Sequence, residues 1–283
     1  MKNFAVIPNP KKDKDLEITK KVVNTLLSSG GIVYIDKSFS GTVADNVTYV
    51  DDFPSDTELI IVVGGDGSML DASVKAVELD VPLVGVNLGK VGYLSEVEPD
   101  NIEILNSVFN NEYKITEKML LTTKLISGEK ESVASRFGVN DVVISHDSFL
   151  GIAEFTVGSF EGGVKYRADG IVISTPAGST AYSLSAGGPI VSHGINAIVV
   201  TPVCPHSFFD RSIIFSPEDI IKIKNTGSEK LNISIDGRYF SALLPDEECV
   251  VETSEKKVKV LTFKENNMFS TLFKKMRILE DVK

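Results

Sequence analysis

The feature that most constrains the fold of this chain is an apolar run that leads directly into a glycine-rich turn. Residues 59–63 read Leu-Ile-Ile-Val-Val, and residues 64–68 read Gly-Gly-Asp-Gly-Ser. An unbroken apolar run is typical of a strand that is buried on both faces, as in a parallel sheet. After the turn, Leu70, Val74 and Val77 recur at helical spacing. The pattern predicts a strand, a turn and then a helix, which is the repeating unit of an α/β domain.

The same alternation extends over residues 1–98. Short apolar runs occupy residues 4–7, 32–35 and 82–86. A helical stripe lies between the first two runs, at Ile18, Val22, Val23, Leu26 and Leu27. We therefore expect residues 1–98 to form an α/β nucleotide-binding domain with a parallel sheet.

Beyond residue 98 the pattern changes to many short strand-like segments separated by Gly, Asp and Ser. Among them are residues 120–127, 138–145, 154–158, 171–175, 197–201, 231–235 and 258–263. Closely spaced strands with little helix between them favour an antiparallel sandwich. We expect a β-rich, sandwich-like domain over residues 99–263, entered through a helix near residues 102–109. An amphipathic helix over residues 264–283 should follow and pack on the first domain.

Composition limits the classes of function. The chain has 29 basic and 39 acidic side chains and a net charge of -10. Such a surface does not by itself attract nucleic acid or an anionic membrane, so a bound nucleotide needs local donors or a divalent cation. Cys204 and Cys249 are too few for a disulfide framework or a metal site. The first apolar run ends at Pro8 and is too short for a signal-peptide core, and no run reaches transmembrane length. We expect a cytoplasmic protein without nucleic-acid or membrane partners.

The glycine-rich turn has the composition of a phosphate site. Glycines let phosphate oxygens approach the backbone N–H groups, and the start of a helix adds further donors. Asp66 is the unusual member, because a carboxylate repels phosphate. Its charge is explained if it removes a proton from a hydroxyl, binds a sugar hydroxyl or holds a bridging metal. The simpler alternative is a tight turn in which Asp66 caps the helix.

Residues 166–191 form the stretch that is richest in small polar side chains. A buried strand at residues 171–174 should precede a helix that begins near residues 179–180. The hydroxyl groups suit a base, an amide or a ribose, Tyr182 suits stacking on a heterocycle, and Asp169 suits an exocyclic amine. For any single serine here, a closely packed helix is the simpler interpretation. For the whole stretch it is not, because so many small polar groups make a poor core without a ligand.

A polar pair, Asn140 and Asp141, interrupts an apolar segment. Such a pair costs free energy unless something satisfies it, and an amide beside a carboxylate suits a nucleoside. A turn at the edge of a strand remains equally consistent with the pair. His206 lies in a loop after Pro205 that suits the rim of a site, and the histidines show no metal-ligand spacing.

These segments, in this order, resemble the NAD kinase family of bacteria and archaea. The matching stretches are residues 64–70, 85–89, 92–94, 140–143, 167–189, 202–206 and 236–237. The central stretch is the most specific, because phosphofructokinases and diacylglycerol-type lipid kinases carry similar glycine loops.

The resemblance implies transfer of a phosphoryl group from ATP, or another donor, to the adenosine ribose 2′-hydroxyl of NAD, giving NADP. It implies Asp66 as the catalytic proton acceptor, a divalent metal ion, expected to be Mg²⁺, and a homo-oligomer (dimer or tetramer) that donates some groups across a subunit interface. The binding residues implied are Gly64, Gly65, Gly67, Ser68, Asn87, Tyr93, Asn140, Asp141, Arg167, Asp169, Thr180, Ala181, Tyr182, Ser183, Leu184, Ser185 and His206.

Three positions depart from the family pattern. Asp141 stands where the family has Glu, Tyr93 replaces a Phe, and Arg238 replaces a Gln found in many members. Two alternatives stay open: another glycine-loop kinase that acts on a sugar phosphate or a lipid, and a nucleotide-binding regulator without turnover. A dehydrogenase is the weakest option, because the turn lacks the third glycine of a dinucleotide fingerprint. The sequence leaves open ATP against polyphosphate as donor, and NADH as acceptor.

Overall fold

The computed structural model of the chain describes residues 2–89, 95–127, 130–147, 151–159, 162–192, 194–206 and 208–263. The chain forms two compact units: unit 1 comprises residues 1–117 and 258–283, and unit 2 comprises residues 118–257. The expected domains ended at residues 98 and 263 instead. The first boundary differs because Ile102, Leu105 and Val108 belong to the core of unit 1. The expected C-terminal helix over residues 264–283 lies outside the described residues.

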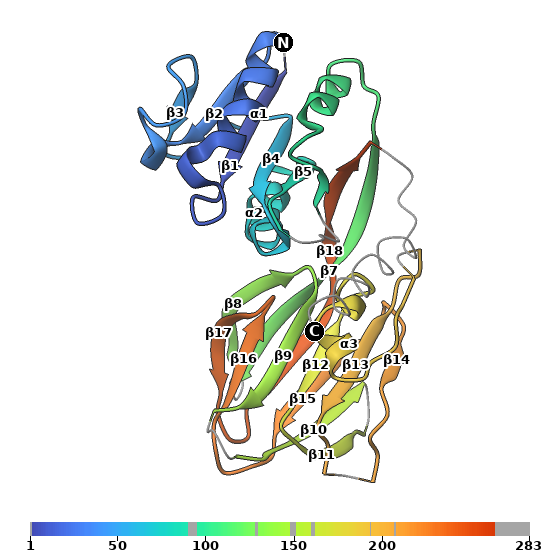
Figure 1. The fold of residues 1–283 in the computed structure, drawn as a ribbon. Coiled ribbons are helices and arrows are strands. Elements are labelled where there is room, and N and C mark those ends of the chain that lie inside the picture. Colours follow the sequence, from blue (N-terminus) through green and yellow to red (C-terminus); the bar gives the residue numbers. More distant parts are fainter. Residues whose placement is uncertain are drawn as a thin grey trace, which may run out of the picture. The chain divides into compact units, whose positions relative to one another are not determined.

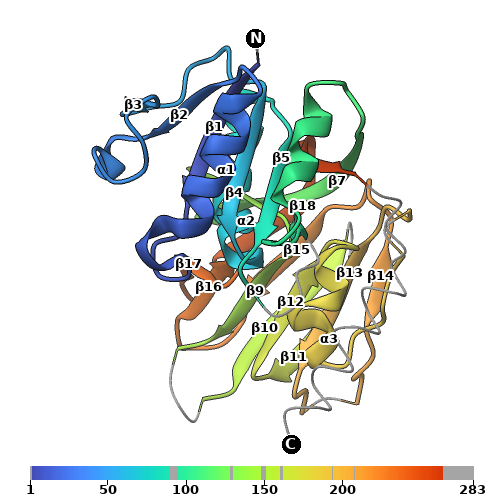
Figure 2. The same ribbon diagram turned by 45° about the horizontal axis from the view of Figure 1, so that its top comes forward.

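Unit 1 contains a parallel sheet in which β4 lies between β1 and β5 (Figures 1 and 2). Its strands are β1 (Asn3–Pro8), β2 (Ile32–Asp36), β3 (Thr48–Val50), β4 (Leu59–Gly64), β5 (Leu83–Asn87) and β6 (Ser95–Val97). They run in the order β6-β5-β4-β1-β2-β3, and every pair is parallel. The end of β18 (Glu248–Thr262) also pairs with β5 in parallel, at Val260 and Leu83.

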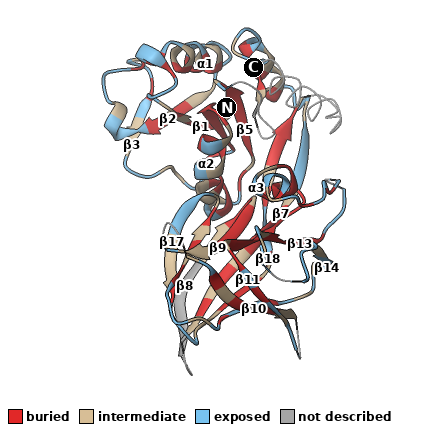
Figure 3. Cartoon of the chain, turned by 60° about the horizontal axis from the view of Figure 1, so that its bottom comes forward, coloured by how far each residue is buried: buried red, intermediate tan, exposed pale blue. Residues whose placement is uncertain are grey.

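The helices of unit 1 are α1 (Glu17–Ser28) and α2 (Asp66–Leu79), with 3₁₀ turns η1 (Lys14–Leu16), η2 (Lys37–Phe39) and η3 (Ile102–Val108). Every residue of β4 and β5 is buried; β5 is drawn in red in Figure 3. This burial on both faces explains why these two strands read as continuous apolar runs. The predicted parallel α/β unit is therefore confirmed.

The start of α2 corrects one expectation. The helix begins at Asp66, inside the glycine-rich turn and not after it. Its buried residues are Ser68, Met69, Ala72, Ser73, Ala76 and Val77, whereas Leu70 and Val74 are only half-buried. Small side chains let the helix approach the sheet closely, so the buried face does not follow the large apolar residues.

Unit 2 is built from two β-sheets that share one apolar core. The first has the order β14-β13-β12-β9-β16-β17, and each printed pair is antiparallel. The second has the order β11-β10-β15-β18-β7-β8 within this unit. The core takes Ile144 and Ile173 from the first sheet and Phe155 and Ile223 from the second. This arrangement confirms the predicted β-rich, sandwich-like domain.

The strands of unit 2 are β7 (Lys114–Ser127), β8 (Lys130–Gly138), β9 (Asp141–His146), β10 (Ala153–Ser159), β11 (Val164–Ala168), β12 (Gly170–Ser174), β13 (Ile198–Val203), β14 (Ile213–Phe215), β15 (Ile221–Asn225), β16 (Leu231–Ile235), β17 (Arg238–Leu243) and β18. A 3₁₀ turn, η4 (Gly178–Thr180), and a short helix, α3 (Tyr182–Ser185), follow β12 where one helix was expected. No helix formed by the described residues has the length and apolar character needed to cross a bilayer.

Candidate functional site

The glycine-rich turn joins the end of β4 to the start of α2. Gly64 is the last residue of β4, Gly65 is the N-cap of α2 and Asp66 is the first helical residue. Two N–H groups, of Ser68 and Met69, already donate to the Gly65 carbonyl oxygen, at 2.9 and 3.1 Å. Because Gly65 occupies the N-cap, the alternative in which Asp66 serves only to cap the helix loses its support. The carboxylate stands in the first helical turn, where a negative charge is stabilised by the helix dipole.

The loops after β1 and β5 border the same turn. Asn9, which follows β1, donates its backbone N–H to the Val63 carbonyl oxygen (3.0 Å) and its side-chain amide to the Ser68 hydroxyl (2.7 Å). After β5, the Leu88 N–H donates to the Gly64 carbonyl oxygen at 2.7 Å. The Asn87 side-chain oxygen accepts from the Gly89 N–H at 2.9 Å, and the residue is 4% exposed. Three parallel strands therefore end side by side here, and ligands of open α/β sheets bind beyond such strand ends.

The glycines of the turn serve different purposes. A Cβ on Gly64 would lie 2.4 Å from the Ser68 hydroxyl oxygen, so close packing requires this glycine. A Cβ on Gly67 would have no atom within 4 Å, so Gly67 borders open space. A Cβ on Gly65 would meet only the side chain of Lys12. The turn thus has a packed side and an accessible side. Tyr93, also predicted here, lies outside the described residues.

In unit 2, Asn140 and Asp141 are held by a carboxylate that the sequence reasoning did not assign. Asp236 accepts three backbone N–H bonds, from Val139 (2.9 Å), Asn140 (2.7 Å) and Asp141 (3.2 Å). Asp236 and Gly237 both have positive φ, at 50° and 74°, and form the tight turn between β16 and β17. An Asp-Gly turn between two strands is a recognisable hairpin signal. That signal marks the turn, but not its contact with Asn140.

Asp141 is 5% exposed, and its carboxyl group accepts no hydrogen bond from the described residues. Burial, and secondly the charge of Asp236, raise the pKa of Asp141 to about 7. Ser174 lies opposite Asp141 in the β9–β12 register, and its buried hydroxyl has no partner either. Unused polar groups in a sheet interior are rare, and titratable groups with displaced pKa values concentrate at functional sites. These features favour a binding site at Asn140 and Asp141 over a simple turn.

The turn after β12 is built onto Asn140. Thr175 bonds with its N–H to the Asn140 carbonyl oxygen (2.9 Å) and with its hydroxyl to the Val139 carbonyl oxygen (2.7 Å). A Cβ on Gly178 would lie 1.9 Å from the Asn140 carbonyl oxygen, so only glycine fits there. The structure thus brings the 178–185 segment, predicted from the sequence, directly against the Asn140 turn.

The predicted residues of that segment differ in how far the fold already uses them. Ser183 is fully buried and bonds with the Thr201 hydroxyl at 3.2 Å. The Thr180 hydroxyl donates to the Ala177 carbonyl oxygen at 3.1 Å. By contrast Tyr182, Leu184 and Ser185 on α3 are exposed, and Ala181 is half-buried. The exposed face of α3 is the part available to a ligand.

Arg167, Asp169 and His206 form a second group. The His206 N–H donates to the Arg167 carbonyl oxygen at 2.7 Å, and the Asp169 N–H donates to Val203 at 3.0 Å. Asp169 directly precedes β12, whereas Ser174, opposite Asp141, ends it. Asp169 and Ser174 therefore lie at opposite ends of one strand, five residues or roughly 16 Å apart at about 3.3 Å per residue. Within one chain the structure does not bring them together.

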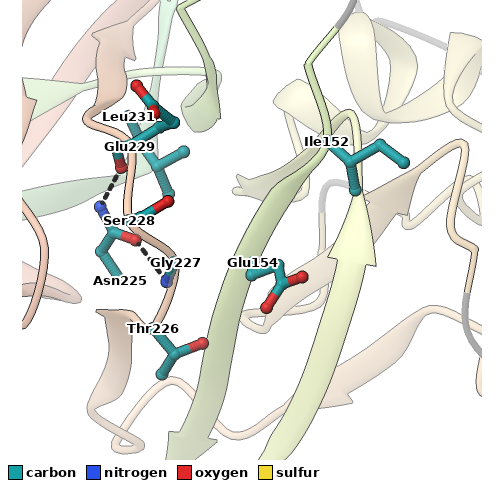
Figure 4. Close-up of a pocket in the computed structure, with 8 residues that line it drawn as sticks. All are labelled: Ile152, Glu154, Asn225, Thr226, Gly227, Ser228, Glu229 and Leu231. Atoms are coloured by element: carbon teal, nitrogen blue, oxygen red, sulfur yellow. Dashed lines mark hydrogen bonds between the residues drawn. The ribbon is translucent and has the colours of Figure 1, made fainter.

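A small polar cavity of about 220 Å³ lies elsewhere in unit 2 and contains no predicted site residue (Figure 4). It is lined by Ile152, Glu154, Asn225, Thr226, Gly227, Ser228, Glu229 and Leu231. The Asn225 amide donates to the carbonyl oxygens of Glu229 (2.8 Å) and Leu243 (3.0 Å) and accepts from Gly227 (3.0 Å). These bonds stabilise the turn after β15, which gives the cavity a structural origin.

A parallel α/β unit with a glycine-rich turn, together with a β-sandwich that carries an Asn-Asp pair with a buried aspartate, is the architecture of a nucleotide-binding phosphotransferase. The chain belongs to the ATP-NAD kinase family: the profile of the ATP-NAD kinase N-terminal domain matches residues 4–113, and that of the ATP-NAD kinase C-terminal domain matches residues 139–263. The NAD kinase of Lachnoclostridium phytofermentans is 35% identical over 96% of this chain and 98% of its own length. The NAD kinase of Caldanaerobacter subterraneus subsp. tengcongensis is 34% identical over 98% of this chain and 99% of its own length. The resemblance read from the motifs, and the function of an NAD kinase that it implies, are confirmed.

Two solved structures share the fold. Yeast NADH kinase, complexed with NADH, superposes with a TM-score of 0.84 at 23% identity, over 96% of this chain and 86% of the yeast chain. An NAD kinase from Archaeoglobus fulgidus, in complex with ATP, has a TM-score of 0.70 at 20% identity, over 96% of this chain and 99% of the Archaeoglobus chain. At these identities the likeness concerns the arrangement of the backbone, and it agrees with the predicted fold class.

Proposed function

We propose that this chain transfers the γ-phosphoryl group of ATP to the adenosine ribose 2′-hydroxyl of NAD, with Asp66 as the general base. The observation that carries the assignment is the position of Asp66. It is the first residue of α2, beside a glycine that already occupies the N-cap. A carboxylate in a turn otherwise suited to phosphate needs a task, and taking up the proton of the attacking hydroxyl supplies one.

In this reaction the ribose oxygen forms a bond to the γ-phosphorus while the bond to the β,γ-bridging oxygen breaks. ADP leaves with that electron pair, and the hydroxyl proton passes to the Asp66 carboxylate and then to solvent. The glycines of the turn leave room for phosphate oxygens near backbone N–H groups, with Gly67 facing open space. Such reactions depend chiefly on alignment and on stabilisation of the phosphoryl charge.

Mg²⁺ belongs to the same proposal. The described residues contain no group of three or more His, Cys, Asp or Glu side chains that would hold a metal ion alone. Mg²⁺ does not need such a group, because it is usually bound through one or two carboxylates together with the substrate phosphates. Asp66 is the carboxylate of the glycine-rich turn that would bind it. When bound, the ion would neutralise charge on the transferring phosphoryl group.

For the acceptor we assign Asn140 and Asp141 to the nucleoside and the exposed face of α3 to the dinucleotide. The Asp141 carboxyl, which has no hydrogen bond from the described residues and a pKa raised to about 7 by burial, can donate to or accept from a ribose hydroxyl. Tyr182, which is 45% exposed, offers a ring for stacking. Ser183 and Thr180 support the segment through internal bonds.

A homo-oligomer completes the proposal. Because Arg167, Asp169 and His206 lie at the other end of β12 from Asp141, a second copy of the chain is assigned to bring that end to the site. Co-expression of an Asp66→Asn chain with an Asp169→Ala chain tests this. Mixed oligomers should regain activity that each variant lacks alone, because one of their sites combines two intact residues. Failure to regain it would place both residues in the same chain's site.

The test of the activity is incubation with NAD, ATP and Mg²⁺, followed by mass spectrometry for one added phosphate on the adenosine ribose. Asp66→Asn should lose about 10²–10⁴-fold in rate and keep NAD binding, since Asn retains the size but cannot take the proton. Glu78→Gln, on the exposed face of the same helix, is the matched control. Near-parental turnover by Asp66→Asn would remove the base assignment, and an inert parent would leave a nucleotide-binding regulator. The same assay should include polyphosphate as an alternative donor and NADH as an alternative acceptor. The cytoplasmic location stays a prediction.

A further inference from the structure

The loop that follows β1 is fixed to both ends of the glycine-rich turn. Asn9 bonds to Val63 on one side and to Ser68 on the other. The same residue also organises its own loop: its carbonyl oxygen accepts from Lys12 at 3.0 Å, and its side-chain oxygen accepts from Lys11 at 3.1 Å. The backbone of Lys12 is therefore held in a defined place relative to the turn.

The side chain of Lys12 reaches across the turn. Its ammonium nitrogen Nζ lies 2.6 Å from the position that a Cβ on Gly65 would take, and 4.0 Å from that of a Cβ on Gly89. The cation therefore lies between the loops that follow β4 and β5. Glycine at residue 65 leaves the space that the ammonium group occupies.

Lys12 has no ion pair and no side-chain hydrogen bond among the described residues. Other lysines of unit 1 are paired: Lys75 with Asp52 at 3.0 Å, and Lys259 with Asp80 at 2.8 Å. Lys11, Lys14 and Lys21 have no ion pair among the described residues either, so what distinguishes Lys12 is the position of its ammonium group at the glycine-rich turn. It also resolves a difficulty, because Asp66 repels phosphate and a neighbouring cation offsets that repulsion.

We propose that Lys12 binds a phosphate oxygen of a nucleotide substrate at the glycine-rich turn. The inference rests on the proposed function, since both substrates of that reaction carry phosphates: the triphosphate of the donor and the pyrophosphate of NAD. Lysine binds phosphate as a point charge, so the recognition concerns the phosphate and not the base. The kinetics of the two substrates decide which one Lys12 contacts.

The test uses Lys12→Met, which keeps an unbranched side chain only one atom shorter and removes its charge, and Lys12→Arg, which keeps the charge. Lys11→Met is the matched control, because Lys11 is the neighbour on the same loop and is exposed, as Lys12 is. The Michaelis constants for ATP and for NAD are measured separately. Hydrogen bonds to charged groups predict a rise of roughly 10-fold or more in one of them for Lys12→Met. Lys12→Arg should restore most of the loss, and Lys11→Met should stay within about two-fold.

A raised constant for ATP assigns Lys12 to the donor, and tripolyphosphate should then show the same loss. A raised constant for NAD assigns it to the acceptor. Unchanged constants for both substrates would overturn the inference. If the parent shows no turnover, the proposed function fails on its own. Calorimetry with Mg-ATP and with NAD, each alone, still tests Lys12, because loss of affinity for either supports it and equal affinities for both contradict it.

Discussion

Replacing Asp141 by Asn should stabilise the protein above neutral pH, and the gain should shrink as the pH falls. The Asp141 residue is 5% exposed and its carboxyl group receives no hydrogen bond from the described residues. Burial and the nearby charge of Asp236 raise the pKa of Asp141 from 3.8 to about 7. Ionised Asp141 therefore destabilises the folded state, and Asn removes the charge at nearly the same size.

The pH dependence follows from the direction of this change. Between about pH 4 and pH 7 the folded state keeps a proton that the unfolded chain has released, so the free energy of unfolding falls as the pH rises through this range. At about 1.4 kcal/mol for each pKa unit, a rise from 3.8 to about 7 corresponds to about 4 kcal/mol. Relaxation around the charge and its coupling to Asp236 reduce this figure. We expect Asp141→Asn to gain about 1–4 kcal/mol at pH 8 and progressively less towards pH 5.

The measurement is urea denaturation at pH 5, 6, 7 and 8, followed by circular dichroism because the chain has no tryptophan. Asp147→Asn is the control. Asp147 is exposed, and its hydrogen bond with Lys230 lowers the pKa of its carboxyl, so its replacement should bring no gain at pH 8. A difference between Asp141→Asn and the parent that is the same at pH 5 and pH 8 would refute the reasoning. So would a variant that is less stable than the parent at pH 8.

Three further outcomes are expected. Tyr182→Ala should weaken NAD binding at least several-fold, since stacking is worth about 1–3 kcal/mol, and should not lower the melting temperature of the protein, because Tyr182 is 45% exposed. An unchanged affinity for NAD in calorimetry would remove Tyr182 from the site. Gly178→Ala should lower stability by about 1–3 kcal/mol and raise the Michaelis constant for NAD, because its Cβ would lie 1.9 Å from the Asn140 carbonyl oxygen; an unaffected constant would separate this turn from NAD binding. Chelation of divalent ions should abolish NADP formation reversibly, and full activity in a chelator would contradict the role of Mg²⁺.

The strands that the sequence predicted best are those buried on both faces. The apolar run at residues 59–63 became β4, the run at residues 82–86 corresponds to β5, and every residue of both strands is buried. The strand β15 was not among the predicted segments. Its residues alternate between buried and exposed, as Ile-Lys-Ile-Lys-Asn, so no continuous apolar run marks it. Alternation over five residues carries less information than a run of the same length, because polar loops produce it by chance.

The site was predictable where its chemistry conflicts with its surroundings. A carboxylate in a glycine-rich turn and a polar pair in an apolar segment both stand out in the sequence. Their partners do not, because contacts across the fold leave no local pattern. Asp236 lies 96 residues from Asn140 along the chain, and Asn9 lies 59 residues from Ser68. Asn9 stands between two prolines and Asp236 stands before a glycine, so each is marked in the sequence only as a turn residue. The pairing of strands brings them to the site.

The polar residues near the predicted site fall into two groups: those whose side chains already have a hydrogen-bond partner within the fold, and those whose side chains have none. Ser183 is fully buried and bonded to Thr201, so its hydroxyl has a partner before any ligand arrives. The Ser174 hydroxyl and the Asp141 carboxyl face each other in register without one. An unused group is not sufficient by itself, since the Thr123 hydroxyl also lacks a partner in the core of unit 2. Two unused groups on neighbouring strands are a stronger sign, because a single ligand hydroxyl can satisfy both. That criterion favours Ser174, which the motif alone did not select, over Ser183, which it did.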